Sequence, residues 1–415
     1  MTGSGSLRVL TAVTALTLGA MVPAHAQESG DTRVGVIAAQ QAEKAKALTP
    51  YVPSRAEKFV NTAEEAVFLG EIAWHPYFES AYAGGGFTLG AGRLTHIGSY
   101  NTLDLRGSIT FSAYKRLEAE FRAPRLFDRR GVLSVIGGWR EATQVGFYGI
   151  GPDASKDDRA NYSFKQPYGS ATFDIWPARH LFVLTGSVEY TQWDQGEGQG
   201  SYPSVDEIYA PDSLPGLGAS PTYLHTMGRI GFDWRRGTSG IRPARGAASG
   251  YSRSGGYYGI RVHDYTDTDD RYGFSLVDYE LIQHIPILRD AWVVSLAGFV
   301  ETSFPKDGQE IPFFMLPSLG GGSTLRGFPS WRFRDRHRMQ VTAEWRALVN
   351  RFLDVALFAD AGKVVPRTGD LDFNDLETDF GIGFRLHGPT ATPLRIDFAK
   401  SNEGLQIVFS AKAAF

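Results

Sequence analysis

The sequence of 415 residues contains no cysteine, which excludes both a disulfide framework and a metal site with cysteine ligands. Beyond the N-terminus it has no long apolar run, and its mean hydropathy is −0.21, so membrane-spanning helices are not expected. The formal net charge is −3, so neither sign of charge dominates. Nucleic acid is therefore not an expected partner. The nine histidines show no ligand spacing, so we expect no metal and no other cofactor.

Glycine and aromatic residues are abundant instead, with 48 Gly, 27 Phe, 18 Tyr and 8 Trp. Length alone would suggest two or three soluble domains. Dispersed apolarity combined with many glycines and aromatics is more typical of a membrane β-barrel.

The N-terminus predicts a secretory signal peptide over residues 1–26. Arg8 precedes an apolar run at Val9–Met21, and Ala24-His25-Ala26 matches a cleavage site, so the mature chain is expected to start at Gln27. A helical anchor is the alternative, but the run is short for a membrane span. Export together with barrel strands implies the outer membrane of a bacterium with two membranes.

Residues 27–80 differ from the remainder of the chain. Val36–Leu48 and Ser54–Leu69 predict two short helices around a proline-containing break. We expect a helical linker that lies in the periplasm or plugs the barrel mouth. The predicted organisation is therefore a signal peptide (1–26), a linker (27–80) and an outer-membrane barrel (81–415).

Strict alternation of apolar and polar residues recurs from residue 81 onward. Every odd position from Met339 to Val349 is apolar, and every even position from Arg338 to Arg346 is polar. Period two indicates a strand with one face toward lipid and one toward a wet lumen. About sixteen candidate strands follow, an even number as such barrels require. They lie near 82–92, 101–112, 114–123, 131–140, 143–150, 161–175, 180–192, 222–235, 245–258, 271–284, 291–303, 338–349, 352–361, 379–387, 393–400 and 404–415.

The predicted fold class is therefore all-β: an antiparallel transmembrane β-barrel. An open sheet in lipid would leave backbone groups unpaired, so closure is expected. Gly-, Pro- and Asp-rich stretches predict long loops on the outside of the cell, at 151–160, 193–220, 259–270, 304–337 and 363–377.

The loop at 316–337 carries the most informative motif. Leu325-Arg326-Gly327-Phe328 follows a glycine run, Phe358–Gly362 reads FADAG, and Gly381–Arg385 reads GIGFR. In this order, and with a C-terminal Phe415, the motifs resemble those of the BamA/TamA superfamily of outer-membrane barrels (the bacterial surface antigen family). The resemblance covers about the last hundred residues firmly and the remaining barrel loosely.

The resemblance implies that the loop folds into the lumen and that Arg326 pairs there with Asp360 and Glu344. The alternation agrees, because both carboxylates fall on the polar faces of their strands. The expected docking surface is Glu344, Phe358, Asp360, Gly362, Gly381, Gly383 and Arg385, where the glycines leave room for a loop. The alternative is that Arg326 is an exposed loop arginine. Residues 331–336 either fill the lumen or form a solvated loop base.

At the C-terminus, an alternating stretch that includes Phe409 and Phe415 resembles the signal that outer-membrane barrels present for their own assembly. Members of the family normally carry periplasmic POTRA modules, for which residues 27–80 are too short. This departure leaves delivery of substrate by such modules in question.

The resemblance implies insertion or translocation of polypeptide, or of lipid, at the outer membrane. Expected partners are outer-membrane lipids and lipopolysaccharide, unfolded outer-membrane or secreted protein clients, and a separate periplasmic protein. The alternatives are a passive or gated pore and a structural surface antigen.

An enzyme is not expected, because the chain has no matching nucleophile or phosphate-loop motif. The acidic run His263–Asp270 suggests calcium binding only weakly, and a solvated outer loop is the simpler interpretation. The glycines of Gly84–Gly90 are expected on a first strand, where they permit curvature or a weak seam.

Overall fold

The computed structural model describes residues 33–47, 73–177, 181–236, 252–288, 291–350, 352–387, 392 and 394–410. The expected signal peptide, the second expected helix at 54–69 and Phe415 lie outside these ranges. Helix α1 (Arg33–Ala47) falls on the first expected helical run. Within the described ranges, no helix is long and apolar enough to cross a membrane.

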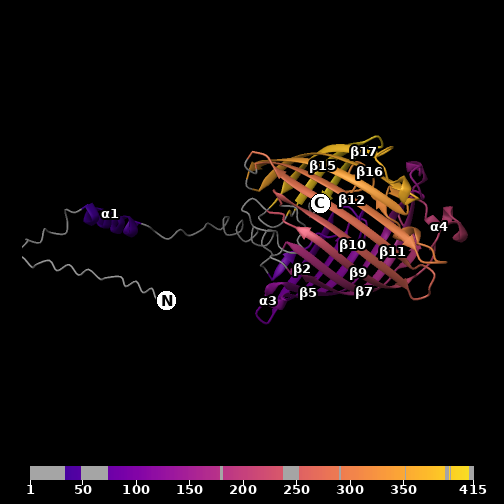
Figure 1. The fold of residues 1–415 in the computed structure, drawn as a ribbon, viewed down its shortest axis with the longest axis horizontal. Coiled ribbons are helices and arrows are strands. Elements are labelled where there is room, and N and C mark those ends of the chain that lie inside the picture. The colour runs from indigo at the N-terminus through magenta and orange to yellow at the C-terminus, as the bar shows by residue number, and fades with distance from the viewer. Residues whose placement is uncertain are drawn as a thin grey trace, which may run out of the picture. The chain divides into compact units, whose positions relative to one another are not determined.

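Residues from Trp74 onward form one sheet of 17 strands wound into a barrel (Figure 1). All pairs are antiparallel, and strands adjacent along the chain are adjacent in the sheet. The strands are β1 (Trp74–Pro76), β2 (Thr88–Ile97), β3 (Asn101–Thr110), β4 (Lys115–Arg125), β5 (Gly131–Phe147), β6 (Ala160–Ile175), β7 (Phe182–Gln192), β8 (Asp194–Glu197), β9 (Thr222–Asp233), β10 (Gly255–Asp267), β11 (Phe274–Pro286), β12 (Trp292–Pro305), β15 (His337–Asn350), β16 (Leu353–Val365), β17 (Glu377–Leu386), β18 (Leu394–Ser401) and β19 (Gly404–Ser410). Because β8 continues β7 and both pair with β6, the described sheet has 16 strand positions. This equals the predicted number only because β5 was predicted as two strands and β1 was not predicted.

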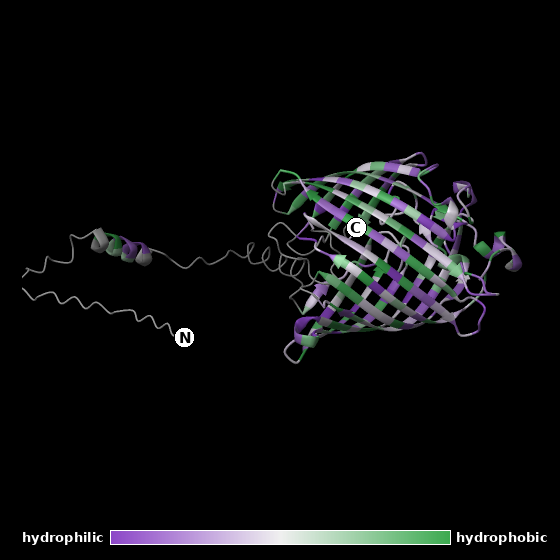
Figure 2. Ribbon diagram, viewed as in Figure 1, coloured by the Kyte–Doolittle hydropathy of each residue, from purple (hydrophilic) through white to green (hydrophobic). Residues whose placement is uncertain are grey.

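Apolar side chains point out of the barrel and polar ones point into it. In β16, Leu357 is 48% exposed on the outer face, whereas Asp360 is 2% exposed on the inner face. Figure 2 shows the same alternation as green and purple bands along the strands. The period-two pattern therefore sets which residues meet lipid and which line the lumen.

The two ends of the barrel differ in their connections. Long loops at 148–159, 198–221, 306–336 and 366–376 lie at one end, because each follows a strand that runs in the same direction. Short turns such as 98–100 lie at the other end, where β19 also finishes. Short helices occur at both ends: α3 (Leu126–Arg129) in a turn and α4 (Val205–Ile208) in a long loop.

Closure of the sheet is the first point at which the structure differs from expectation. The ladder runs from β1 to β19, and in the described residues no pairing register joins β19 to β1 or β2. The reason is that β1 pairs with β2 over only three residues, after which the chain turns inward at Tyr77. We call this gap between β19 and the β1–β2 edge the seam.

The expected first strand at 82–92 is also wrong in its position. Gly84 and Gly86 have φ values of +90° and +77°, so the glycine run is a turn and β2 starts only at Thr88. Strand β1 lies before residue 81, where the barrel was expected to begin.

Two further expectations need correction. The expected strands at 131–140 and 143–150 are one strand, β5, with a bulge between Ala142 and Val145 that imitates a turn in the sequence pattern. The expected loop at 259–270 is largely strand β10, because its residues up to Asp267 pair with β9 and those up to Tyr265 pair with β11 as well. Asp267 accepts hydrogen bonds from two backbone N–H groups and closes the turn that follows.

The orientation of the faces can be tested on β9. Ile230 faces outward and Met227 faces the lumen. Ile230→Arg should lower the free energy of unfolding by about 2 kcal/mol, because the charge enters hydrocarbon, and Met227→Arg should change it much less. Urea unfolding in lipid vesicles, followed by tryptophan fluorescence, measures both; equal losses would contradict the assignment.

Candidate functional site

The connection between β12 and β15 (residues 306–336, the lid loop) folds back into the lumen. Its two short strands, β13 (Ser318–Leu319) and β14 (Phe333–Arg334), pair with each other and bring the ends of the tip together. Gly320 and Gly321 have φ values of +109° and +94°, and the Gly321 N–H bonds the carbonyls of Leu325 and Phe328 at 3.0 and 3.1 Å. The glycine run therefore makes the tight turn that presents the next residues to the barrel wall.

Arg326 lies at the tip of the lid loop and is 1% exposed. Its Nε and Nη2 donate to the two carboxylate oxygens of Asp360 at 2.7 and 2.9 Å, and its Nη1 donates to Glu344 at 2.9 Å. The structure thus brings these three residues together in a bidentate pair with a third charged bond, which is the strongest geometry a guanidinium can adopt.

The surroundings of Arg326 keep it charged. Its Cζ atom is 3.4 Å from the centroid of the Phe358 ring, a close cation–π contact. Burial by itself would lower the pKa of Arg326, but the hydrogen bond and charge of Asp360, together with Glu344, raise it above the ordinary value. The lid loop is therefore held by a permanent cation.

The partners of Arg326 belong to a larger set, which we call the ion cluster. Arg385 donates to Glu344 at 2.8 Å and to Asp397 at 2.5 Å. Arg395 lies 3.1 Å from Asp397 and donates to the carbonyl of Gly322 in the lid loop. The members are Arg326, Arg385, Arg395, Glu344, Asp360 and Asp397. Arg346 also lies 3.9 Å from Glu344, and all these side chains are buried, so any charge left alone there would be costly.

Most of the glycines that were expected to leave room for the lid loop leave room for side chains of the barrel wall instead. A Cβ on Gly362 would lie 3.1 Å from Leu319 of the lid loop. A Cβ on Gly381 would lie 2.5 Å from the Phe358 ring, and one on Gly383 would overlap the Asp397 carboxylate. Two of the three glycines therefore make room for the groups that hold Arg326 and its neighbours.

Further contacts hold the motif residues in place. Leu325 and Phe328 are buried in an apolar cluster with Leu319, Phe333 and Val364. The carbonyl of Gly327 accepts a hydrogen bond from Ser401 Oγ at 2.7 Å. Phe409 points outward on β19, so it does not take part in the site.

The rest of the lid loop fills the lumen near the long-loop end. Residues 332–335 are buried, and Arg334 donates to the carbonyl of Phe313 at 2.7 Å beside Tyr162. Phe313 belongs to a large, mostly aromatic cluster built from the lid loop, the loop at 198–221 and the neighbouring strands. Of the two interpretations left open for residues 331–336, the geometry supports the filled lumen.

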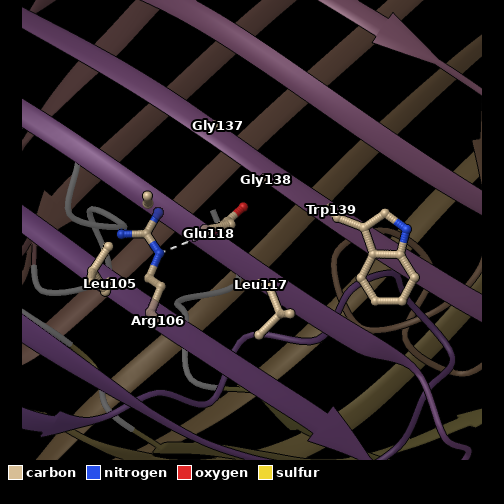
Figure 3. Close-up of a pocket in the computed structure, with 8 residues that line it drawn as sticks. Leu105, Arg106, Leu117, Glu118, Gly137, Gly138 and Trp139 are labelled. Carbon is tan, nitrogen blue, oxygen red and sulfur yellow. Dashed lines mark hydrogen bonds and ion pairs between the residues drawn. The ribbon is translucent and has the colours of Figure 1, made fainter.

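The opposite wall carries a second charged group that the sequence did not indicate. Glu118 on β4 accepts hydrogen bonds from Arg106 at 2.8 Å and Tyr77 at 3.1 Å, and it pairs with Arg116 at 2.6 Å. Figure 3 shows the Arg106–Glu118 bond beside a hollow of about 530 Å³ at Gly137 and Gly138. The alternation in β4 could have placed Glu118 on the lumen face. The contribution of Tyr77 could not have been found in this way, because residue 77 was assigned to the linker.

The members of the ion cluster that were not predicted are Arg395 and Asp397. Alternation had placed both on the polar face of their strand, opposite Leu394, Ile396 and Phe398. Their contact with Arg385 and the lid loop depends on strand register, which the pattern does not supply.

Comparison with known proteins concerns the fold of the barrel. The family model of the Omp85 superfamily domain matches residues 252–410. BamA from Haemophilus ducreyi lacking POTRA domains 1–3 superposes with a TM-score of 0.56 at 16% identity, over 81% of this chain and 68% of that one. CdiB from Escherichia coli superposes with a TM-score of 0.50 at 13% identity, over 79% of this chain and 57% of that one. Among curated proteins, none matches the sequence. The predicted resemblance to the BamA/TamA superfamily is confirmed.

Removing the charge of Arg326 should loosen the lid loop. Arg326→Ala leaves Asp360 and Glu344 buried with one cation fewer, which should cost roughly 3–5 kcal/mol. Limited proteolysis of the protein in vesicles should then cut the lid loop faster. The control is Arg367→Ala, whose pair with Asp370 is exposed on another loop and should leave cleavage unchanged. Equal protection of Arg326→Ala and wild type would contradict the assignment.

The role of the glycines gives a second test. Gly383→Ala should destabilise the barrel by roughly 1–3 kcal/mol, because the added methyl group displaces Asp397 and Arg385. Gly369→Ala is the matched control, since nothing lies within 4 Å of its Cβ position. The midpoint of thermal unfolding by circular dichroism measures both, and an unchanged midpoint for Gly383→Ala would show that the cluster is loosely packed.

Proposed function

We propose that this protein inserts or translocates polypeptide chains at the outer membrane, because residues 252–410 match the family model of the Omp85 superfamily domain. Its clients would be unfolded outer-membrane or secreted proteins that reach the barrel from the periplasm. A separate periplasmic protein that delivers them is a further part of the proposal.

The seam is the observation that carries this proposal. Among the described residues, β19 has a pairing register with β18 alone, and β1 covers three residues of the β2 edge before the chain leaves the sheet. Unpaired N–H and C=O groups cost several kcal/mol each in hydrocarbon. An extended client segment can supply the missing partners, since edge strands readily add a strand.

The lid loop contacts residues on both sides of the seam. These contacts support the idea that the position of the lid loop affects how far the seam opens. On one side Arg332 pairs with Glu403, next to β19, at 2.7 Å. On the other side Trp331 donates to the carbonyl of Ala83 at 3.0 Å and stacks on Tyr82 at 4.4 Å. Movement of the lid loop would therefore disturb the segments next to both edges.

A passive pore is less well supported. The lumen holds the lid loop, the ion cluster and the aromatic cluster around Phe313, which leave the long-loop end filled. A conducting state would require these groups to move.

Locking the seam tests the proposal. Leu89→Cys and Ile407→Cys place thiols on the outer faces of β2 and β19, and the natural chain has no cysteine that would compete. In cells depleted of the wild-type protein, bridging this pair with bis-maleimides of graded length should lower the amounts of particular outer-membrane or secreted proteins. Quantitative proteomics, with transcripts measured in parallel, reports the loss.

The matched control joins two strands that are already paired. Tyr258→Cys and Leu281→Cys lie opposite each other on β10 and β11, and both point outward. Bridging this pair should leave the proteome unchanged. An unchanged proteome with the seam bridged would remove the support for insertion and favour a gated pore.

A further inference from the structure

A cavity of about 590 Å³ opens at the seam, between the segment at 78–88 and strand β19. Three arginines line it: Arg116 on β4, Arg140 on β5 and Arg395 on β18. Glu79 is the one carboxylate among its lining residues. The cavity wall therefore carries an excess of positive charge.

Arg395 and Arg140 are not fully neutralised by their neighbours, whereas Arg116 pairs with two carboxylates. Arg395 is 1% exposed, and its Nη1 has no hydrogen-bond partner in the described residues. Its carboxylate, Asp397, is shared with Arg385 and lies 3.7 Å from Arg326. A buried donor without a partner is costly, so a ligand acceptor at this position would be stabilising.

Arg140 is also available to an anion. Arg140 donates to the neutral Gln166 at 2.5 Å, and among the described residues no carboxylate forms an ion pair with it. Arg116 pairs with Glu79 and Glu118 at 3.0 and 2.6 Å, but its Nε has no partner in the same part of the chain. Guanidinium groups that line one cavity can bind a phosphate group together.

Apolar side chains also line the cavity. Phe78, Ile407 and Phe409 line it and are exposed on the surface, the last two on the lipid-facing side of β19. Apolar groups attached to an anion at the arginines could thus extend past these side chains toward the hydrocarbon.

From this arrangement we propose that the seam cavity is a binding site for a phosphate group, with room for the acyl chains of a phosphate-bearing lipid to leave through the seam. The arginines bind the phosphate, and the apolar side chains contact the acyl chains. This site goes beyond the proposed insertion of polypeptides, since it concerns a different ligand.

Isothermal titration of the full-length protein in detergent micelles tests the site. The probes are dihexanoyl phosphatidic acid and, in a parallel arm, inorganic phosphate. Saturable binding of the phosphatidic acid is expected. Arg140→Gln and Arg395→Gln should each weaken it by about tenfold or more, because each removes a charged hydrogen bond.

Arg229→Gln is the matched control. Arg229 lies on the lumen face of β9, pairs with Asp174 and does not line the cavity, so binding should be unchanged. Mobility of the unheated protein on SDS gels shows whether each variant folds. Arg395→Gln also disturbs the ion cluster. If that variant does not fold, the binding measured for Arg140→Gln alone tests the site.

The arms separate the sources of the phosphate. Tighter binding of phosphatidic acid than of inorganic phosphate supports a lipid, and equal binding supports a soluble phosphate compound at the same site. Absence of saturable binding, or equal binding by wild type and Arg140→Gln, would overturn the proposal. So would tighter, arginine-dependent binding of a peptide through its terminal carboxylate. Because no client is present, these results are independent of the seam-locking experiment.

Discussion

The contact between Arg326 and the carboxylates of Asp360 and Glu344 is the interaction on which the interior of this barrel depends. A loop that enters a lumen loses conformational freedom, and each polar group it brings must find a partner. Arg326 supplies three charged hydrogen bonds from one side chain and rests on the Phe358 ring. The loop can therefore be buried without leaving its own charge unpaired.

The same balance explains why the cluster extends beyond three residues. Glu344 and Asp397 are shared with Arg385, and Asp397 is shared again with Arg395. Displacing the lid loop would leave the wall with one cation too few and would free the carbonyl of Gly322 beside Arg395.

Backbone pairing is the second constraint, and the seam is where it is not met. Elsewhere each barrel strand pairs on both sides, because hydrocarbon offers no other partner. The chain leaves the sheet after Pro76, and residues 77–86 instead contact the inner wall: the carbonyls of Glu79 and Ser80 accept hydrogen bonds from Ser108 and Arg116. An N-terminal segment inside the lumen leaves both edges free, with the arginine-lined cavity between them.

The alternation in the sequence determined most of the wall, because period two alone assigns each residue to lipid or lumen. It placed Glu344, Asp360, Arg395 and Asp397 inside. The motif around Arg326 pointed to the pairing with Asp360 and Glu344. The bulge in β5 was predicted as a turn between two strands, and the glycine turn at 84–86 was predicted as part of a strand, so the predicted strand boundaries were wrong there.

Only the tertiary structure decided which inward residues meet. Arg385, Arg395 and Asp397 come together through the register of β17 with β18. The inward course of residues 77–86, and with it the seam, depends on contacts with β3, β4 and the lid loop, which lie far away in the sequence. Periodicity records the face on which a side chain lies, but not its height along the barrel or the partner opposite, and these depend on long-range packing.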